Sequence, residues 1–302
     1  MEKILEYTVS ETDNGLTIKA VLSRRMGLSR HEISRLKFMY DGILLNECPV
    51  RVTQKVMPHD IIRLRFSDPS DAVSVRTGFI PDILYEDEDL LAVNKPAGIP
   101  SHPSKGHVSD DMGSIIKGYY REPLVIRTAG RLDKDVSGIM IYAKNQPASA
   151  RLSKQREEGI LRKTYCAFVG GTPDPLSGTL VYGLQDTEGS PKRIFIPDGD
   201  SCVTDYETIR SGEAFSKVHV QIRTGRTHQI RAGFAGTGHP LLGDELYGGS
   251  TEMIHRPALH CFKVQLKQPF TGNDICVEAP LPDDMKAIEK AGLEPCCQIQ
   301  SE

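Results

Sequence analysis

This chain of 302 residues lacks several features, and each absence excludes a class of protein. No apolar run approaches the ~20 residues that a membrane-spanning helix needs, and the N-terminus lacks the basic-then-apolar pattern of a secretion signal. The seven cysteines are an odd number, and none has the Cys-x-x-Cys spacing that is typical of zinc or redox sites. We therefore expect a cytoplasmic protein with reduced thiols, no membrane contact and no metal site.

The chain also has little excess of charge of either sign, since its net charge is only −3. By itself, this value would argue against binding to nucleic acid. The distribution along the chain is uneven, however. Between Gly15 and Phe66 there are ten Lys or Arg residues against four acids, so this segment carries +6 and the remainder of the chain carries −9. A basic segment on an acidic body is typical of a module that binds phosphate groups. The length of the chain suits such a division into two domains.

The basic segment has the pattern of a small α/β domain. Residues 16–22 have near-helical apolar spacing, and Ser29 and Glu32 form a capping box that opens a second helix. Two short strands are expected at 43–46 and 61–66, each after a turn. On the second helix Ile33 and Leu36 should face inward, with Arg30 and Lys37 outward.

Strands dominate the rest of the chain. The pattern predicts extended structure at 83–94, 138–144, 164–169 and 215–223. Helices are expected at 148–158 and, capped by Thr227, at 228–236. On the latter helix Ile230 and Phe234 should face the core, while Arg231 lies about 100° around the helix and can face a cleft. This irregular mixture indicates an α+β fold whose large sheet is mixed or mainly antiparallel.

Four polar segments carry the functional signal. They are YEDEDLLAVNKPAG at residues 85–98, GRLDKDVSG at 130–138, KTY at 163–165, and TGRTHQIR at 224–231 running into GHPLLGDELYG at 238–248. Together, in this order, they resemble the RluA-type family of RNA pseudouridine synthases. No single segment would be specific, because a lone Arg-Leu-Asp occurs widely. The resemblance covers roughly residues 80 to 284, and the family's fold agrees with the α+β prediction.

The resemblance implies a reaction that cuts the N1–C1′ bond of uridine, turns the base and rejoins it through C5, without a cofactor. Such chemistry needs a carboxylate beside the sugar, as in a retaining glycosidase. The carboxylate must stay ionised although desolvation raises its pKa, and a nearby guanidinium opposes that shift. The resemblance assigns the carboxylate to Asp133 and its ion-pair partner to Arg231. It assigns Tyr165 as the residue that packs on the base and can assist proton removal from C5. Formation of a covalent ester and proton removal at C2′ both remain open for Asp133.

Other residues of these segments have less specific interpretations. Asp135 is a rival carboxylate two residues from Asp133, and Arg131 contacts RNA or supports the turn. His228 and His239 are expected to be structural hydrogen-bonding residues, because no Cys or His at metal-ligand spacing accompanies them. Two positions depart from the family, which usually has histidine at 130 and threonine at 136. These departures, Gly130 and Val136, leave the subgroup and hence the substrate open.

The basic segment resembles the S4-type RNA-binding domain that often precedes this catalytic domain, although Asn46-Glu47 replaces its usual Asn-Gly. A small appendage with a merely solvated basic face is the alternative. The expected domains are 13–67 (S4-like), 68–79 (linker), 80–288 (catalytic) and 289–302 (weakly ordered tail). The residues that we expect to contact RNA are Arg24, Arg25, Arg30, Arg35, Lys37, Arg131 and Arg226.

The sequence therefore predicts a monomeric enzyme that converts uridine to pseudouridine in structured RNA. Large-subunit ribosomal RNA is the expected substrate, with transfer RNA as an alternative. The target base must be flipped out of its stack, at a cost of a few kcal/mol that phosphate contacts by the basic segment can offset. Two rival functions are a non-catalytic RNA-binding or ribosome-assembly factor on the same fold, and a hydrolase of N-glycosidic bonds.

Overall fold

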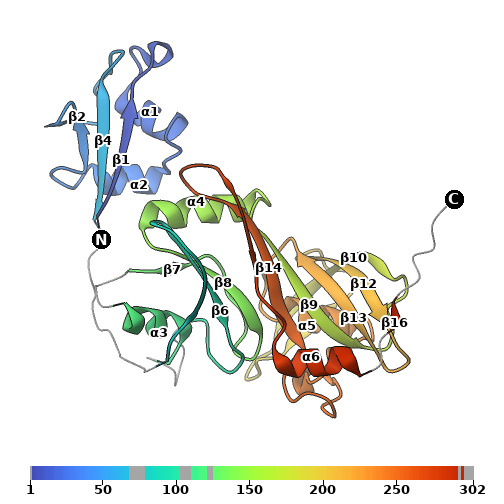
Figure 1. Ribbon diagram of the computed structural model, residues 1–302. Helices are drawn as coiled ribbons and strands as arrows, with labels where there is room; N and C mark the ends of the chain where they lie inside the picture. The colour runs from blue at the N-terminus through green and yellow to red at the C-terminus, as the bar shows by residue number, and fades with distance from the viewer. Residues whose placement is uncertain (1, 68–78, 103–109, 121–124, 292–293, 296–302) are drawn as a thin grey trace.

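The computed structural model describes residues 2–67, 79–102, 110–120, 125–291 and 294–295 (Figure 1). The chain forms two sheets, one of four strands near the N-terminus and one of twelve strands. Each sheet has its own hydrophobic core, because the buried residues of the first core all lie between Val9 and Phe66. We call residues 2–67 the head and the described residues from 79 to 295 the body. Nearly all of the expected linker, 68–79, lies outside the described residues.

The head is a four-stranded antiparallel sheet in the order β1-β4-β2-β3, packed against two short helices. Its elements are β1 (Glu2–Thr8), η1 (Glu11–Asp13), α1 (Ile18–Arg24), α2 (Arg30–Leu36), β2 (Ile43–Leu45), β3 (Cys48–Pro49) and β4 (Ile61–Ser67). The capping box at the start of α2 is confirmed: the Ser29 side chain accepts from the Glu32 amide, and the Glu32 carboxylate accepts from the Ser29 amide. Ile33 and Leu36 are buried as predicted.

The strand β1 was not anticipated from the sequence. It pairs with β4 along its whole length, from Glu2 opposite Ser67 to Thr8 opposite Ile61. The head therefore includes residues 2–14, which contain four acids and one lysine, so its excess of positive charge over residues 2–66 falls from six to three. Part of the basic character is thus balanced within the same small sheet.

The body confirms the α+β prediction. The main path of its sheet runs β11-β10-β12-β13-β9-β14-β8-β6-β5, and β14–β8 is a parallel pair in a sheet that is otherwise antiparallel. The strands are β5 (Asp82–Glu86), β6 (Leu90–Lys95), β7 (Arg127–Thr128), β8 (Ser137–Ala143), β9 (Arg162–Gly170), β10 (Ser177–Asp186), β11 (Arg193–Ile196), β12 (Cys202–Ser211), β13 (Phe215–Ile222), β14 (Leu259–Lys267), β15 (Asp274–Glu278) and β16 (Glu294–Pro295). The helices are α3 (Met112–Tyr119), α4 (Gln146–Glu157), α5 (Gln229–Gly236), η2 (Glu245–Tyr247) and α6 (Asp283–Lys290).

Several predicted boundaries shift. The stretch 83–94 is two antiparallel strands rather than one, because the Asp87 carboxylate accepts from the amides of Asp89 and Leu90 and turns the chain. At the C-terminal end, α6 continues to Lys290, and the two-residue strand β16 pairs with β12. The rest of the expected tail lies outside the described residues.

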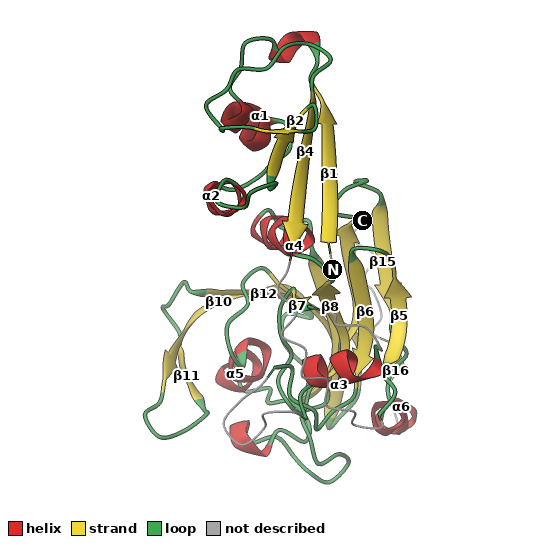
Figure 2. Cartoon of the chain, turned by 90° about the vertical axis from the view of Figure 1, so that its left-hand side faces the viewer, coloured by secondary structure: helices red, strands yellow, loops and turns green. Residues whose placement is uncertain are grey.

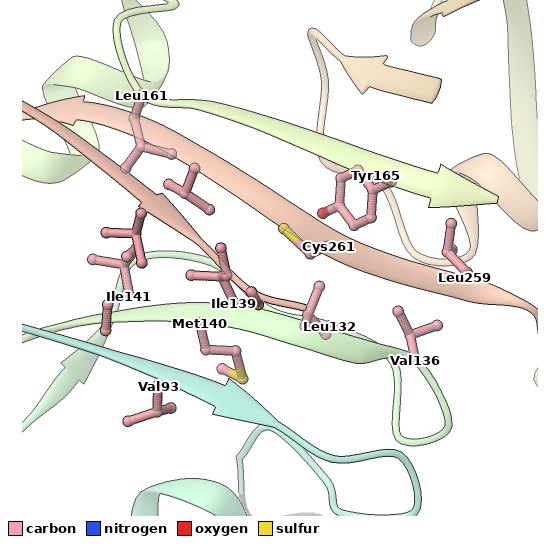
Figure 3. Packing of buried hydrophobic residues seen from close by; sticks show 14 of the residues in the cluster. Val93, Leu132, Val136, Ile139, Met140, Ile141, Leu161, Tyr165, Leu259 and Cys261 are labelled. Atoms are coloured by element: carbon pink, nitrogen blue, oxygen red, sulfur yellow. The ribbon is translucent and has the colours of Figure 1, made fainter. Parts of the chain in front are cut away.

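The strand β9 is the centre of the body because both of its faces are buried. Tyr165, Ala167 and Val169 face the main core, which Ile230 and Phe234 of α5 also join as predicted. The alternate residues Cys166 and Phe168 face a second core beneath α6. Figure 3 shows Tyr165 beside Cys261, its partner on β14, with Leu132 and Val136 across the same core. Side chains of a strand point alternately to opposite faces, so one strand joins both cores.

The head rests on the body beside α4 (Figures 1 and 2). The Lys3 ammonium lies 2.8 Å from the buried Asp89 carboxylate. Arg151 of α4 donates to the carbonyl of Met26 at 2.9 Å, and its guanidinium lies 4.2 Å from the centre of the Phe270 ring. The strand that was not anticipated, β1, thus also supplies a contact with the body.

No helix within the described ranges is both long and apolar enough to cross a bilayer. Of the seven cysteines, the five within those ranges are free thiols.

Candidate active site

Asp133 lies in the loop between β7 and β8, and buried neighbours fix that loop. Leu132 and Val136 are 5% and 2% exposed and both belong to the main core. Gly138, the second residue of β8, has φ of +115°, and a Cβ there would lie 2.3 Å from the carbonyl oxygen of Cys261. Only glycine allows β8 to approach β14 this closely. The loop therefore leaves the core at a fixed place, and the Asp133 side chain is 19% exposed.

The segment that follows β6 holds the backbone on both sides of Asp133. Ser101 Oγ donates to the carbonyl of Leu132 at 2.5 Å and accepts from the Leu132 amide at 3.0 Å. The Lys134 carbonyl accepts from the amide of Gly98 at 3.0 Å and from Lys95 Nζ at 2.8 Å. Because Ser101 and Lys95 are buried, these hydrogen bonds are shielded from water.

Lys95 is an unusual lysine because its side chain is completely buried. Its ammonium donates to three carbonyls, those of Pro96, Ile99 and Lys134, each at 2.8 Å, so all three protons are used. Burial lowers the pKa of Lys95 to about 7, although the carboxylates of Asp135 and Asp133 raise it. Lys95 therefore joins the turn after β6 to the loop that carries Asp133.

Arg231 lies between two carboxylates, one of which the sequence analysis did not identify. Its Nη1 donates to Asp133 Oδ2 at 3.2 Å, which brings the predicted pair together. Its Nε and Nη2 donate to Asp244 Oδ2 and Oδ1 at 2.7 and 2.8 Å. Burial opposes the charge of this guanidinium, but the hydrogen bonds and charge of Asp244, and then of Asp133, raise the pKa of Arg231. Asp244 thus fixes the guanidinium in a bidentate pair, which leaves one edge for Asp133.

The turn before α5 differs from the prediction. The N-cap position is occupied by His228, with φ of +57° and no side-chain cap, rather than by Thr227. The buried Gln229 organises the turn instead: its Oε1 accepts from Thr224 Oγ1 at 2.9 Å and from the Arg226 amide at 3.0 Å. As a result, the His228 ring lies beside Asp133, with Nε2 3.7 Å from Oδ2. His228 was expected to be only a structural hydrogen-bonding residue.

Tyr165 lies on β9 and is 4% exposed. Burial, and then the charges of Cys261 and Asp133, raise the pKa of Tyr165 well above its usual value. The hydroxyl is therefore neutral at neutral pH, within range of the charge of Asp133.

The remaining predicted residues of the loops lie outside this cluster. Asp135 and Arg131 are exposed, and so is Arg226 in the turn before α5. His239 contacts the carbonyl of Gly170 through Nδ1 at 2.9 Å, as expected of a structural residue. Gly130 has φ of +124°, a conformation that side chains rarely adopt, and a Cβ there would lie 3.3 Å from Lys163 Nζ. This explains why glycine suits a position where histidine is usual.

The basic residues of the head differ in their exposure and in whether they contact an acidic or polar side chain. Arg24, Arg30 and Lys37 are exposed. Arg25 is exposed as well, but its Nε lies 2.6 Å from Asp13. Arg35 is half-buried and contacts the side chain of Gln146 in the body.

Within the described part of the chain, no group of three or more His, Cys, Asp or Glu side chains could hold a metal ion. The site instead consists of one guanidinium between two carboxylates, with an imidazole and a phenol beside them. Such an arrangement can present an oriented carboxylate to a bound molecule and stabilise developing positive charge on it.

Comparisons with known proteins identify the family. The model of a family described as RNA pseudouridylate synthase matches residues 89–236. The "Uncharacterized RNA pseudouridine synthase YhcT" of Bacillus subtilis (strain 168) is 35% identical over 296 residues, which cover 94% of this chain and 96% of that protein. The "Ribosomal large subunit pseudouridine synthase D" of Vibrio parahaemolyticus is 31% identical over 319 residues, covering 95% of this chain and 94% of that protein.

A solved structure shows the same fold. "Human RNA Pseudouridylate Synthase Domain Containing 1" superposes with a TM-score of 0.58 at 22% identity, over 74% of this chain and 91% of that chain. The sequence matches extend along nearly the whole chain, and the matched region includes Asp133, Tyr165 and Arg231. The chain therefore belongs to the RluA-type family of RNA pseudouridine synthases, isomerases that act on RNA.

Proposed function

We propose that this enzyme isomerises uridine to pseudouridine in structured RNA, with Asp133 as the catalytic carboxylate. The observation that supports this assignment most directly is the 3.2 Å contact between Asp133 Oδ2 and Arg231 Nη1 in a largely buried site. Asp135 has no such position, because its side chain is exposed. A carboxylate held by a guanidinium can remain charged beside the sugar, as the reaction requires.

Arg231 and Tyr165 have separate roles in this proposal. Arg231 holds Asp133 and keeps its negative charge stable after water is excluded. Tyr165 packs against the uracil ring through its aromatic face. Its raised pKa keeps the phenol neutral, so it acts through packing and hydrogen bonding rather than as a phenolate base. No cofactor is needed, because the reaction neither oxidises the substrate nor transfers a phosphoryl group.

The head acts as an S4-like RNA-binding domain in this proposal. Exposed positive side chains at Arg24, Arg30 and Lys37 support that role, and Arg25 and Arg35 belong to the same proposed set. Arg131 and Arg226, which are exposed on the loops around the site, contact the phosphates that flank the target nucleotide. Such contacts would offset the few kcal/mol needed to flip a base, about the range that base-flipping enzymes face.

Large-subunit ribosomal RNA is the proposed substrate, and the enzyme works as a monomer in the cytoplasm. Support comes from relatives along nearly the whole chain whose names specify the large ribosomal subunit, at 31% and 28% identity in Vibrio parahaemolyticus and Nitrosomonas europaea. Transfer RNA is the alternative substrate.

The test is to incubate the purified protein with unmodified transcripts of large-subunit ribosomal RNA and of transfer RNAs, and then to map pseudouridine. We expect modification in the ribosomal transcript by the wild-type protein and none by Asp133→Asn, which should bind RNA with a Kd within a few-fold. Asp135→Asn is the matched control and should remain active. An active Asp133→Asn protein, or a product with the base lost, would contradict the proposal.

A further inference from the structure

His228 has two ring nitrogens that face two different partners. Nδ1 lies 3.0 Å from the hydroxyl oxygen of Tyr247, and Nε2 lies 3.7 Å from Asp133 Oδ2. The side chain is only 11% exposed. The imidazole ring also packs edge to face against the ring of Tyr247, with 5.7 Å between the two centroids. The ring therefore has a fixed orientation beside the catalytic carboxylate.

The hydrogen bonds around Tyr247 favour one nitrogen of His228 as the carrier of the proton. The Tyr247 hydroxyl accepts from the backbone amide of Arg193 at 2.8 Å. Its own hydrogen remains available for Nδ1 of His228, and in that arrangement Nδ1 is the acceptor. Burial lowers the pKa of His228, and although Asp133 raises it, Arg231 lowers it further, so the ring is neutral at neutral pH. A neutral ring that accepts at Nδ1 carries its only proton on Nε2, the atom that faces Asp133.

The two groups beside Asp133 approach the same oxygen. Arg231 Nη1 lies 3.2 Å from Oδ2, and His228 Nε2 lies 3.7 Å from it. Among the residues that the structure describes, none forms a hydrogen bond with Oδ1 of Asp133. One oxygen is thus held by the protein, and the other is left for the bound nucleotide.

On the basis of the function proposed above, we propose that His228 is a positioning residue that donates from Nε2 to Oδ2 of Asp133 and so directs Oδ1 at the sugar. Tyr247 acts through His228 by holding the tautomer that has its proton on Nε2. The 3.7 Å separation is longer than a hydrogen bond. Catalytic hydrogen bonds are often long without substrate and shorten in the complex, and a movement of less than 1 Å is enough here.

A matched pair of substitutions at residue 228 tests this role. In His228→Gln the side-chain amide can replace Nε2–H as a donor, whereas in His228→Asn the shorter amide reaches only the position of Nδ1. We expect kcat to fall about 10- to 100-fold in His228→Asn, the range for losing a hydrogen bond to a charged group, and to stay within about 3-fold in His228→Gln. KM should change little in either variant. Equal losses of kcat in the two variants would overturn the proposal.

Tyr247→Phe tests the tautomer while it keeps the aromatic ring. We expect kcat to fall about 5- to 10-fold in the wild-type background and hardly at all in His228→Gln, since coupled residues are non-additive. An equal effect in both backgrounds would refute the link. Independently of activity, ¹⁵N chemical shifts should show a bare Nδ1 and a protonated Nε2 for His228, assigned from the His228→Gln spectrum. A protonated Nδ1 in the wild-type protein would also overturn the inference.

The control is His239→Asn, which keeps a donor for the Gly170 carbonyl and should leave kcat unchanged. Failure of this inference can be distinguished from failure of the proposed function. That failure would be a wild-type protein that forms no pseudouridine, whereas this inference fails if the wild type is active and His228→Asn is equally active.

Discussion

The head and the body use charged side chains in opposite ways. In the head, Arg24, Arg30 and Lys37 are exposed, and several other basic residues form surface ion pairs such as Arg63 with Glu6 at 2.6 Å. In the body, Arg231 is 9% exposed and Asp244 is 1% exposed. Exposed charges act over distance and are screened by salt, whereas buried pairs are short-ranged and insensitive to salt. In the proposed function the head would therefore bind RNA, and the body would hold one carboxylate in place.

The largest expected effect is at the buried pair. Asp244→Asn removes the charge that fixes Arg231, and breaking a buried ion pair costs about 3–5 kcal/mol of stability. Because the guanidinium can then shift away from Asp133, we expect kcat to fall about 100-fold, equivalent to roughly 3 kcal/mol. Steady-state rates at low and high salt should show the same loss. The neighbouring exposed residue supplies the control, Glu245→Gln, which should match the wild type. A folded Asp244→Asn protein with nearly full kcat would contradict this role.

The next largest effect is expected from lowering the pH, which should destabilise the body more than the head. His260 of the body is 1% exposed, with Nδ1 2.9 Å from Ser137 Oγ, and burial lowers the pKa of His260 to about 4. In the unfolded chain, the His260 imidazole takes up a proton with a pKa near 6.5. The contribution of neutral His260 to the free energy of unfolding is therefore fully present above pH 6.5 and is lost as the pH falls towards 4. Between pH 7.5 and 4.5 the wild type should lose about 2–3 kcal/mol more than His260→Asn, which does not titrate. Denaturant titrations followed by circular dichroism measure the difference. In the head, His31 and His59 are exposed, so His59→Asn should change this pH dependence little.

A smaller effect is expected at Ser101, whose hydroxyl forms two hydrogen bonds with the backbone of Leu132. In Ser101→Ala both backbone groups lose a buried partner, at a cost of about 1–3 kcal/mol. Asp133 then becomes less well placed, and we expect kcat to fall about 10-fold while the Kd for RNA stays unchanged. Single-turnover rates and binding titrations separate the two quantities. The exposed Ser153 provides the comparison, since Ser153→Ala should alter neither. If Ser101→Ala weakened RNA binding and left the single-turnover rate unchanged, the hydroxyl would contribute to RNA binding and not to the placement of Asp133.

The smallest effect at physiological salt is expected in the head. Replacing Arg30 and Lys37 by glutamine should lower the slope of log K against log salt by about 2, because each phosphate contact contributes about 1. The value of kcat at saturating RNA should not change, which is the opposite of the result at Asp244. Arg63→Gln is the matched control, since its guanidinium is already paired with Glu6. An unchanged slope in the double variant would remove the distinction between the two regions.

The sequence predicted the parts of the fold that depend on local pattern. The capping box at Ser29 and the inward face of α5 are set by neighbouring residues, and both were confirmed. The strand β1 was missed because its stability depends on β4, more than fifty residues away. The N-cap of α5 was placed at Thr227 because threonine is a common cap, but the buried Gln229 satisfies the turn instead.

Only the site residues that lie in motifs shared with the family were predicted from the sequence. Asp133 and Arg231 lie 98 residues apart in sequence and were paired through the motifs that contain them. The role of Asp244 could not be read in the same way, because an aspartate in a turn has no distinctive local signature. His228 requires still more, since its tautomer depends on Tyr247 and on a backbone amide from β11. Such relations exist only after the chain has folded.

The triad of Asp133, Arg231 and Asp244 also determines what can enter the site. Two carboxylates around a single guanidinium leave one net negative charge on the floor of the site. A phosphate approaching that floor would be repelled, whereas a ribose with its uncharged base would not. In the function proposed above, this charge would admit an uncharged nucleoside while the polyanionic strand passes outside.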